Sequence, residues 1–153
     1  MAITMREGDA AFIEQLVGFY VKSVTNADVH LATSIWLNDP KTSMIHPRGE
    51  DIGWENIRQH FYLDRLQKLY TERSFEISHL DIQTYRDAAI AMFTWQLKGK
   101  LRSDGTEISH AGRTSHVFYK VAQEGWRRTS QGGWKIIHAH VSGMPITSER
   151  QHI

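Results

Sequence analysis

The second half of the chain carries a pattern typical of β-strands separated by short turns, and this pattern limits the possible folds most strongly. Four segments carry it: Ser74–Tyr85, Ala88–Lys100, Thr106–Val121 and Trp134–Ser142. The short connections RDA, SDG and QGG separate them, and the last two contain a glycine where a tight turn requires positive φ. Consecutive strands with short turns predict an antiparallel sheet.

The first half has helical periodicity instead. Phe12, Leu16, Phe19 and Tyr20 form one apolar stripe, which predicts a helix from a cap at Asp9 to about Val24. Asp28 is expected to cap a second helix that stops at the NDP segment, residues 38–40. Residues 53–70 predict a third helix, and Thr42–His46 predicts a short strand between the second and the third.

Helices followed by strands predict an α+β protein with the helices on one face of a sheet. We expect one domain over residues 1–153, since no repeat or linker interrupts the pattern.

Hydrophobic residues make up 41% and charged residues 23%, as in globular proteins. The net charge of +1 gives no basic surface for nucleic acid or an anionic membrane. The sequence has no cysteine, which excludes disulfides and thiolate chemistry. No apolar run approaches the ~20 residues of a membrane span, so we expect a cytoplasmic protein.

Several motifs resemble the nuclear-transport-factor-2-like superfamily, which includes ketosteroid isomerases, scytalone dehydratases, SnoaL-like cyclases and the association domain of calcium/calmodulin-dependent kinase II. The segments DAAIAMFTWQL, SHAGRTSHVFYK and GWKIIHAHVSG are similar to the last strands of the association domain, and FYVKSVTNAD and SMIHP are similar to ketosteroid isomerase. The resemblance covers nearly the whole chain. It implies a cone, in which a curved antiparallel sheet wraps around three N-terminal helices and leaves a pocket at the open end.

The resemblance to the isomerase also implies two site residues. Its oxyanion-holding tyrosine falls on Tyr20, and its general base, which precedes a proline, falls on His46. Histidine exchanges protons near neutral pH, so His46 suits that role. The alternatives are a strand-end histidine bonded to backbone and a core tyrosine whose hydroxyl reaches the surface.

Strand alternation and the same resemblance add further candidates. Side chains at every second position share a face, so His110, Gly112, Thr114, His116 and Phe118 lie together. The association-domain resemblance turns His116 and Trp95 toward the pocket, and Trp36, Trp54 and Phe61 are candidates for its walls. In the last strand it turns Ile137, Ala139 and Val141 inward, with Trp134, Ile136, His138 and His140 on the opposite face.

These candidates lead to two hypotheses about function. The first is an isomerase, dehydratase or cyclase that needs no cofactor, binds a small apolar molecule, and uses His46 as base with Tyr20 and His116 holding an oxygen. The second is a non-catalytic ligand-binding or oligomerisation module. Under either hypothesis we expect a homodimer or larger ring formed through the sheet. We expect no metal, because His138 and His140 have no identifiable third ligand. Residues 124–133, EGWRRTSQGG, could contact phosphate, but a solvated loop is the alternative.

Overall fold

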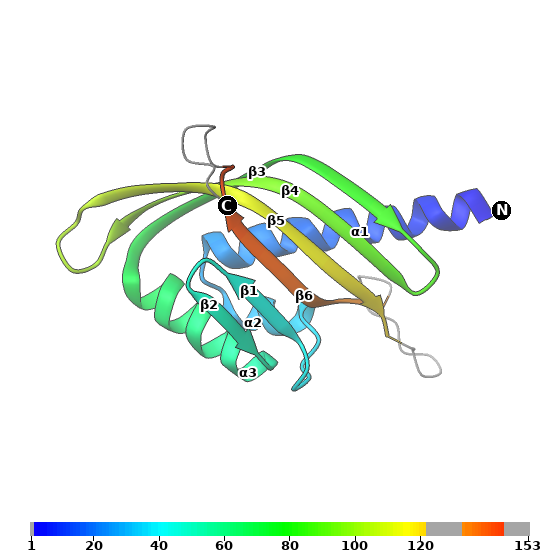
Figure 1. Ribbon diagram of the computed structural model, residues 1–153, viewed down its shortest axis with the longest axis horizontal. Helices are drawn as coiled ribbons and strands as arrows, with labels where there is room; N and C mark the ends of the chain where they lie inside the picture. Colours follow the sequence, from blue (N-terminus) through cyan, green and yellow to red (C-terminus); the bar gives the residue numbers. More distant parts are fainter. Residues whose placement is uncertain (1, 122–132, 146–153) are drawn as a thin grey trace, which may run out of the picture.

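Six strands form one curved sheet in the computed structural model, which describes residues 2–121 and 133–145 (Figure 1). The strands are β1 (Ser43–His46), β2 (Gly49–Ile52), β3 (Tyr70–Thr84), β4 (Ala88–Leu101), β5 (Glu107–Lys120) and β6 (Trp134–Gly143). Their order across the sheet is β2-β1-β6-β5-β4-β3. The expected α+β cone is confirmed, but the sheet is mixed, because β1 pairs with β6 in parallel. The loop expected to contact phosphate lies outside the described residues, apart from Gly133.

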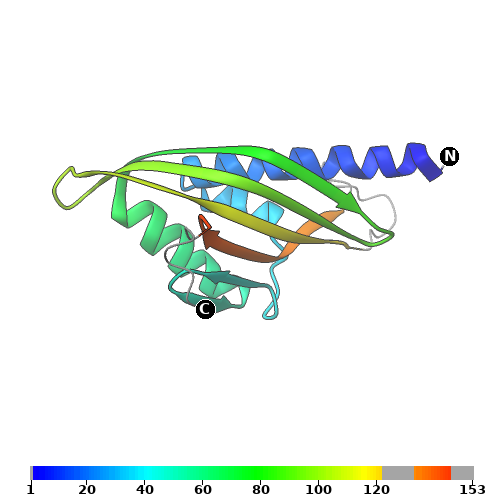
Figure 2. The same ribbon diagram turned by 45° about the horizontal axis from the view of Figure 1, so that its top comes forward.

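The helices lie on one side of this sheet, as Figures 1 and 2 show. They are α1 (Ala2–Thr25), α2 (Val29–Ile35), α3 (Trp54–Ile57) and the π-helix η1 (Arg58–Gln67). Asp28 caps α2 as predicted, and its side chain accepts a hydrogen bond from the Leu31 amide. Among the described helices, none has the length and apolar character needed to cross a bilayer.

Asp9 does not cap α1, which begins seven residues earlier at Ala2. A side chain in the helix interior is free to bond elsewhere, and the Asp9 carboxylate accepts from the indole of Trp134 at 3.4 Å and from Lys120 Nζ at 3.5 Å. The residue therefore ties α1 to β5 and β6 and does not cap the helix N-terminus.

The third predicted helix begins as a single α-helical turn and continues as the π-helix η1. In an α-helix, residues five apart are separated by about 1.4 turns, whereas the i→i+5 hydrogen bonds of a π-helix bring them closer to one face. His60 and Arg65 form one such pair and Phe61 and Leu66 another, and all four line the cavity described below.

Two of the register shifts in the sheet bear on its shape and facing. In β3 the register with β4 shifts between Ser78 and Asp81, where His79 has a φ of 55°, and such a bulge bends a strand. In β6 a second shift leaves Ile137 without a partner, since Val117 pairs with His138 and Phe118 with Ile136.

The second bulge corrects the predicted alternation in β6. The extra residue moves Trp134 and Ile136 to the inner face, where both are fully buried, and Ala139 stays buried there as expected. His138 and His140 remain on the outer face, and the Nδ1 atom of His138 lies 2.8 Å from Ser43 Oγ on β1. A one-residue bulge reverses the facing of every residue before it.

The core fills the space between the inner sheet face and the helices. Its centre is a chain of hydrogen bonds: Trp36 Nε1 donates to the Tyr62 hydroxyl at 3.1 Å, which lies 2.9 Å from Ser23 Oγ. Ser23 Oγ in turn donates to the Tyr20 carbonyl oxygen at 2.7 Å, so the Tyr62 hydroxyl is the donor to Ser23. The chain joins α1, α2 and η1 and fixes the position of Tyr20.

Candidate functional site

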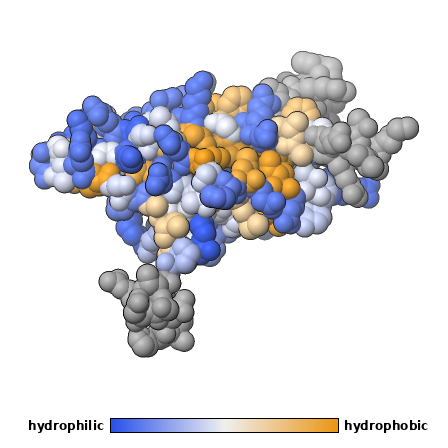
Figure 3. All heavy atoms as spheres, turned by 90° about the horizontal axis from the view of Figure 1, so that it is seen from above, coloured by the Kyte–Doolittle hydropathy of each residue, from blue (hydrophilic) through white to orange (hydrophobic). Residues whose placement is uncertain are grey.

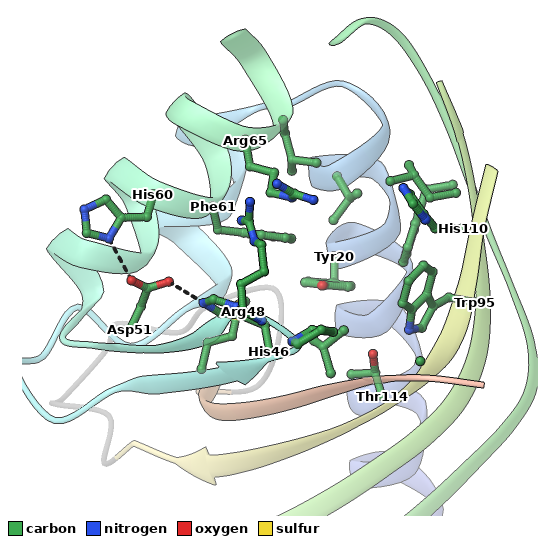
Figure 4. Close-up of a pocket in the computed structure, with 18 of the residues that line it drawn as sticks. Tyr20, His46, Arg48, Asp51, His60, Phe61, Arg65, Trp95, His110 and Thr114 are labelled. Carbon is green, nitrogen blue, oxygen red and sulfur yellow. Dashed lines mark hydrogen bonds and ion pairs between the residues drawn. The ribbon is translucent and has the colours of Figure 1, made fainter. Parts of the chain in front are cut away.

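A cavity of about 620 Å³ lies between the helices and the inner face of the sheet. Figure 4 shows residues from α1, the β1–β2 hairpin, η1 and the long strands pointing into it. Its apolar wall includes Val24, Phe61, Leu66, Phe75, Trp95 and Leu97. Its polar residues include His46, Arg48, Glu50, Asp51, His60, Arg65 and His110. The interior is thus apolar, and most of the charge lies on the hairpin and η1.

The β1–β2 hairpin places an aspartate in this cavity. His46 pairs with Gly49 across the two-residue turn Pro47-Arg48, and Gly49 has a φ of 139°. Asp51 pairs with the buried Met44, so its side chain lies on the inner face and is 10% exposed. A carboxylate placed this way needs partners, because a buried charge without hydrogen bonds is strongly unfavourable.

Two histidines supply those partners. His46 Nε2 lies 3.0 Å from Asp51 Oδ2, and His60 Nδ1 lies 2.7 Å from Asp51 Oδ1. Since a carboxylate only accepts, we assign a proton to each of these ring nitrogens. The other nitrogen of His46, Nδ1, then accepts a long hydrogen bond of 3.3 Å from the Arg48 amide. The hairpin thus orients His46 with a lone pair at Nδ1.

Tyr20 lines the same cavity from α1. Its side chain is 2% exposed, and its hydroxyl makes no hydrogen bond within the described residues. Burial, and then the nearby Tyr62, raise the pKa of Tyr20 well above the ordinary value, so the hydroxyl keeps its proton. A protonated phenol without a partner in a cavity can donate a hydrogen bond to a ligand oxygen. His46 and Tyr20 therefore face one cavity from different elements.

His116 lies in the core behind Tyr20 and does not line the cavity. Its ring packs edge-on against Tyr20, with 4.5 Å between ring centroids, and it also meets Phe93 and Phe118 edge-on. Neither ring nitrogen has a hydrogen-bond partner. Burial, and then the charge of His138, lower the pKa of His116 to about 3, so the ring is neutral at physiological pH.

Of the other candidate wall residues, two line the cavity and two lie in the core. Trp95 and Phe61 line the cavity, and Trp95 stacks on Phe75 with 6.0 Å between ring centroids. Trp36 and Trp54 are nearly fully buried and stack on each other at 5.9 Å, outside the cavity lining.

Sequence patterns did not reveal five polar cavity residues: Arg48, Glu50, Asp51, His60 and Arg65. The segment Arg48–Ile52 has a single apolar residue, Ile52, and its inward-facing residue is the polar Asp51, so it does not resemble a typical strand. The two-residue spacing of a hairpin between His46 and Gly49 was the available signal. His60 and Arg65 share a face only in a π-helix. Within residues 8–121 and 133–145, no three histidine, aspartate or glutamate side chains are arranged to hold a metal ion.

Comparisons with known proteins give a consistent family. The SnoaL-like domain family matches residues 13–147. A nuclear transport factor 2-like superfamily protein from Salmonella enterica serovar Typhimurium is similar with a TM-score of 0.86 and 29% identity, over 97% of this chain and 99% of that one. No curated protein matches at a significant level.

Two more distant structures share the fold. The hexachlorocyclohexane dehydrochlorinase LinA-type3 from Novosphingobium barchaimii has a TM-score of 0.73 and 16% identity, over 93% of this chain and 90% of that one. A ketosteroid isomerase-like protein from Erwinia carotovora has a TM-score of 0.69 and 16% identity, over 90% and 98% of the two chains. Because the family match spans most of the sequence, the chain belongs to the SnoaL-like domain family.

Proposed function

We propose that this protein is an enzyme that needs no cofactor and removes a proton from carbon beside a carbonyl in a small, largely apolar molecule. The observation that carries the proposal is Asp51, a buried carboxylate that holds His46 by its Nε2 atom at a cavity. An aspartate orients a histidine in this way where the histidine acts as a general base, because it fixes the tautomer and stabilises the imidazolium. Proteins named as a dehydrochlorinase and as ketosteroid isomerase-like share the fold.

In the proposed reaction, His46 Nδ1 takes the proton and its hydrogen bond from the Arg48 amide breaks. The C–H electron pair moves to the carbonyl oxygen, and the Tyr20 hydroxyl donates a hydrogen bond to the resulting enolate. Return of the proton to another carbon gives isomerisation. Loss of a leaving group from the neighbouring carbon gives dehydration or a related elimination, and attack on a second carbonyl gives cyclisation.

The remaining candidates have supporting roles in this proposal. Trp95 and Phe61 contact the apolar part of the substrate. His116 does not touch it, and we assign it the role of positioning residue, because its ring packs edge-on against Tyr20. Trp36 and Trp54 act through the core, since Trp36 donates to the Tyr62 hydroxyl that anchors Ser23 and the end of α1.

One observation favours a second function, a ligand-binding module without chemistry. The lone pair of His46 Nδ1 already accepts the Arg48 amide hydrogen, and a histidine satisfied on both nitrogens can be purely structural. At 3.3 Å, the bond from the Arg48 amide is weaker than the 3.0 Å bond between His46 and Asp51. His46 Nδ1 can therefore give up this bond and accept a proton from the substrate.

Deuterium exchange into a model ketone tests the proposal. 2-Tetralone is incubated in D₂O with the protein, and loss of its C1 proton signal is followed by NMR. We expect the protein to accelerate exchange, and His46→Gln to lower the rate by about 100-fold, the typical contribution of a general base. His30→Gln, on the exposed face of α2, is the matched control and leaves the rate unchanged. A wild-type rate equal to that of His46→Gln contradicts catalysis and favours the module.

A further inference from the structure

The cavity contains two arginines whose guanidinium groups have no ion-pair partner among the described residues. Arg48 is in the β1–β2 turn and Arg65 on η1, and Figure 4 shows both side chains beside Phe61 at the cavity. Neither guanidinium group makes a hydrogen bond or ion pair within the part of the chain that the structure describes. Other arginines are engaged: Arg58 pairs with a glutamate at 3.0 Å, and Arg73 and Arg102 donate to backbone carbonyl oxygens.

The nearest carboxylates do not meet this charge. Both oxygens of Asp51 are taken by His46 and His60. Glu50 also lines the cavity, but its side chain is exposed and makes no ion pair within the described residues. The guanidinium groups of Arg48 and Arg65 therefore remain unpaired at the cavity within the described residues.

Arg48 also acts on the cavity wall. Burial raises the pKa of Tyr70, and the positive charge of Arg48 acts in the opposite direction, so the guanidinium group lies within electrostatic reach of the Tyr70 phenol. Tyr70 lines the cavity on β3, and its hydroxyl makes no hydrogen bond within the described residues. Arg48, Arg65 and Tyr70 thus offer donors to the same space.

We infer that Arg48 and Arg65 form a carboxylate-binding subsite, and that the natural ligand of this protein joins one carboxylate to an apolar ring system. A guanidinium group presents a planar fork of donors that matches a carboxylate. Because the carboxylates of Glu50 and Asp51 also line the cavity, they disfavour a phosphate dianion more than a monoanion. Phe61, Phe75 and Trp95 supply aromatic surface for the ring system. The inference rests on the proposed function only in requiring that the cavity bind a small molecule.

The test uses 2-naphthoate and its uncharged analogue 2-naphthamide, which share size and shape but differ in charge. Binding of each is measured by fluorescence titration to the wild-type protein. We expect the carboxylate to bind roughly 10- to 100-fold more tightly than the amide, the range for hydrogen bonds to a charged group. Added sodium chloride weakens binding of 2-naphthoate and leaves that of 2-naphthamide nearly unchanged, because only the former is electrostatic.

Arginine variants locate the subsite. Arg65→Gln and Arg48→Gln each reduce the affinity for 2-naphthoate toward that for 2-naphthamide, while the amide affinity stays constant. Arg86→Gln, an exposed residue between β3 and β4, removes the same charge and serves as the control, with no expected effect. Thermal melting of each variant confirms folding, and neither cavity arginine makes a bond whose loss would destabilise the protein.

Four outcomes would overturn the inference. Equal affinity of the wild type for acid and amide, or an acid preference that survives both substitutions, removes the subsite but leaves the proposed cavity function intact. Tighter binding of 2-naphthyl phosphate than of 2-naphthoate overturns the assignment to a carboxylate. Binding of none of the three compounds overturns the subsite together with the proposal that the cavity binds aromatic molecules.

Discussion

At the scale of single residues, His116 gives the clearest pH-dependent prediction. Its pKa is lowered to about 3 in the folded protein and returns to an ordinary value near 6.5 on unfolding. Between these values the unfolded state binds the extra proton, so the free energy of unfolding falls as the pH falls. From pH 7 to pH 5 the loss attributable to His116 is about 2 kcal/mol.

The variant His116→Leu removes this dependence, because leucine has a similar volume and no proton to bind. Urea unfolding at pH 7 and pH 5 measures this pH dependence. The difference between the free energies of unfolding at the two pH values is about 2 kcal/mol smaller in the variant than in the wild type. At pH 7 the variant stays within about 1.5 kcal/mol of the wild type, since neither imidazole nitrogen loses a partner. Equal pH dependence in both proteins shows that His116 is not buried as described.

The hydroxyl of Tyr62 is predicted to stabilise the core through the chain of hydrogen bonds that joins three helices. Tyr62→Phe leaves the buried Trp36 indole without an acceptor and lowers the free energy of unfolding by about 1–3 kcal/mol. Tyr85→Phe is the matched control, because that hydroxyl is bonded to Gln83 on the surface. Chemical denaturation compares the two, and equal effects contradict the described network.

At the scale of elements, the sheet tolerates no side chain at Gly112. A Cβ there overlaps the carbonyl oxygen of Ser142 on β6 and comes within 2.6 Å of the Trp95 ring on β4. Gly112→Ala therefore separates strands or displaces Trp95 from the cavity wall, and we expect a lower melting temperature and weaker binding of 2-naphthamide. Gly18→Ala is the contrasting control: its Cβ meets nothing, and in a helix interior it stabilises by about 0.5–1 kcal/mol. A gain in melting temperature for Gly112→Ala would refute this packing.

The elements also show which features follow from sequence. The long strands were predictable, because their sequences are typical of strands and short turns separate them, and Asp28 is a typical helix cap. The bulge at Ile137 was not, since it depends on how β5 and β6 pair over their whole length. Asp51 and Arg65 escaped prediction for related reasons: a polar strand resembles a loop, and a π-helix changes which residues share a face.

At the scale of the whole molecule, we predict a homodimer or larger ring formed through the outer face of the sheet. Figure 3 shows apolar side chains gathered on one face of the molecule. On the outer face of β4 and β5, Met92 and Tyr119 are 44% and 46% exposed. Light scattering at micromolar concentration is expected to give a mass above the 17.7 kDa of one chain.

A charge on that face tests the location of the interface. Met92→Glu is expected to reduce the mass to that of one chain, while Ile52→Glu, equally apolar and exposed but on the edge strand β2, leaves it unchanged. A wild-type protein that stays at 17.7 kDa contradicts the assembly. Dissociation by Ile52→Glu alone would place the interface at the hairpin instead.

The central proposal is that His46 transfers the proton and that the protein folds without it. His46→Ala tests this when melting temperature and 2-tetralone exchange are measured on the same sample. Because the Asp51 oxygen released by the substitution faces a cavity that admits water, we predict a shift below about 3 °C, equivalent to under 1 kcal/mol, with exchange reduced to the background rate. A fall in melting temperature matching about 1–3 kcal/mol, with exchange unchanged from the wild type, would make His46 a structural residue and contradict the account.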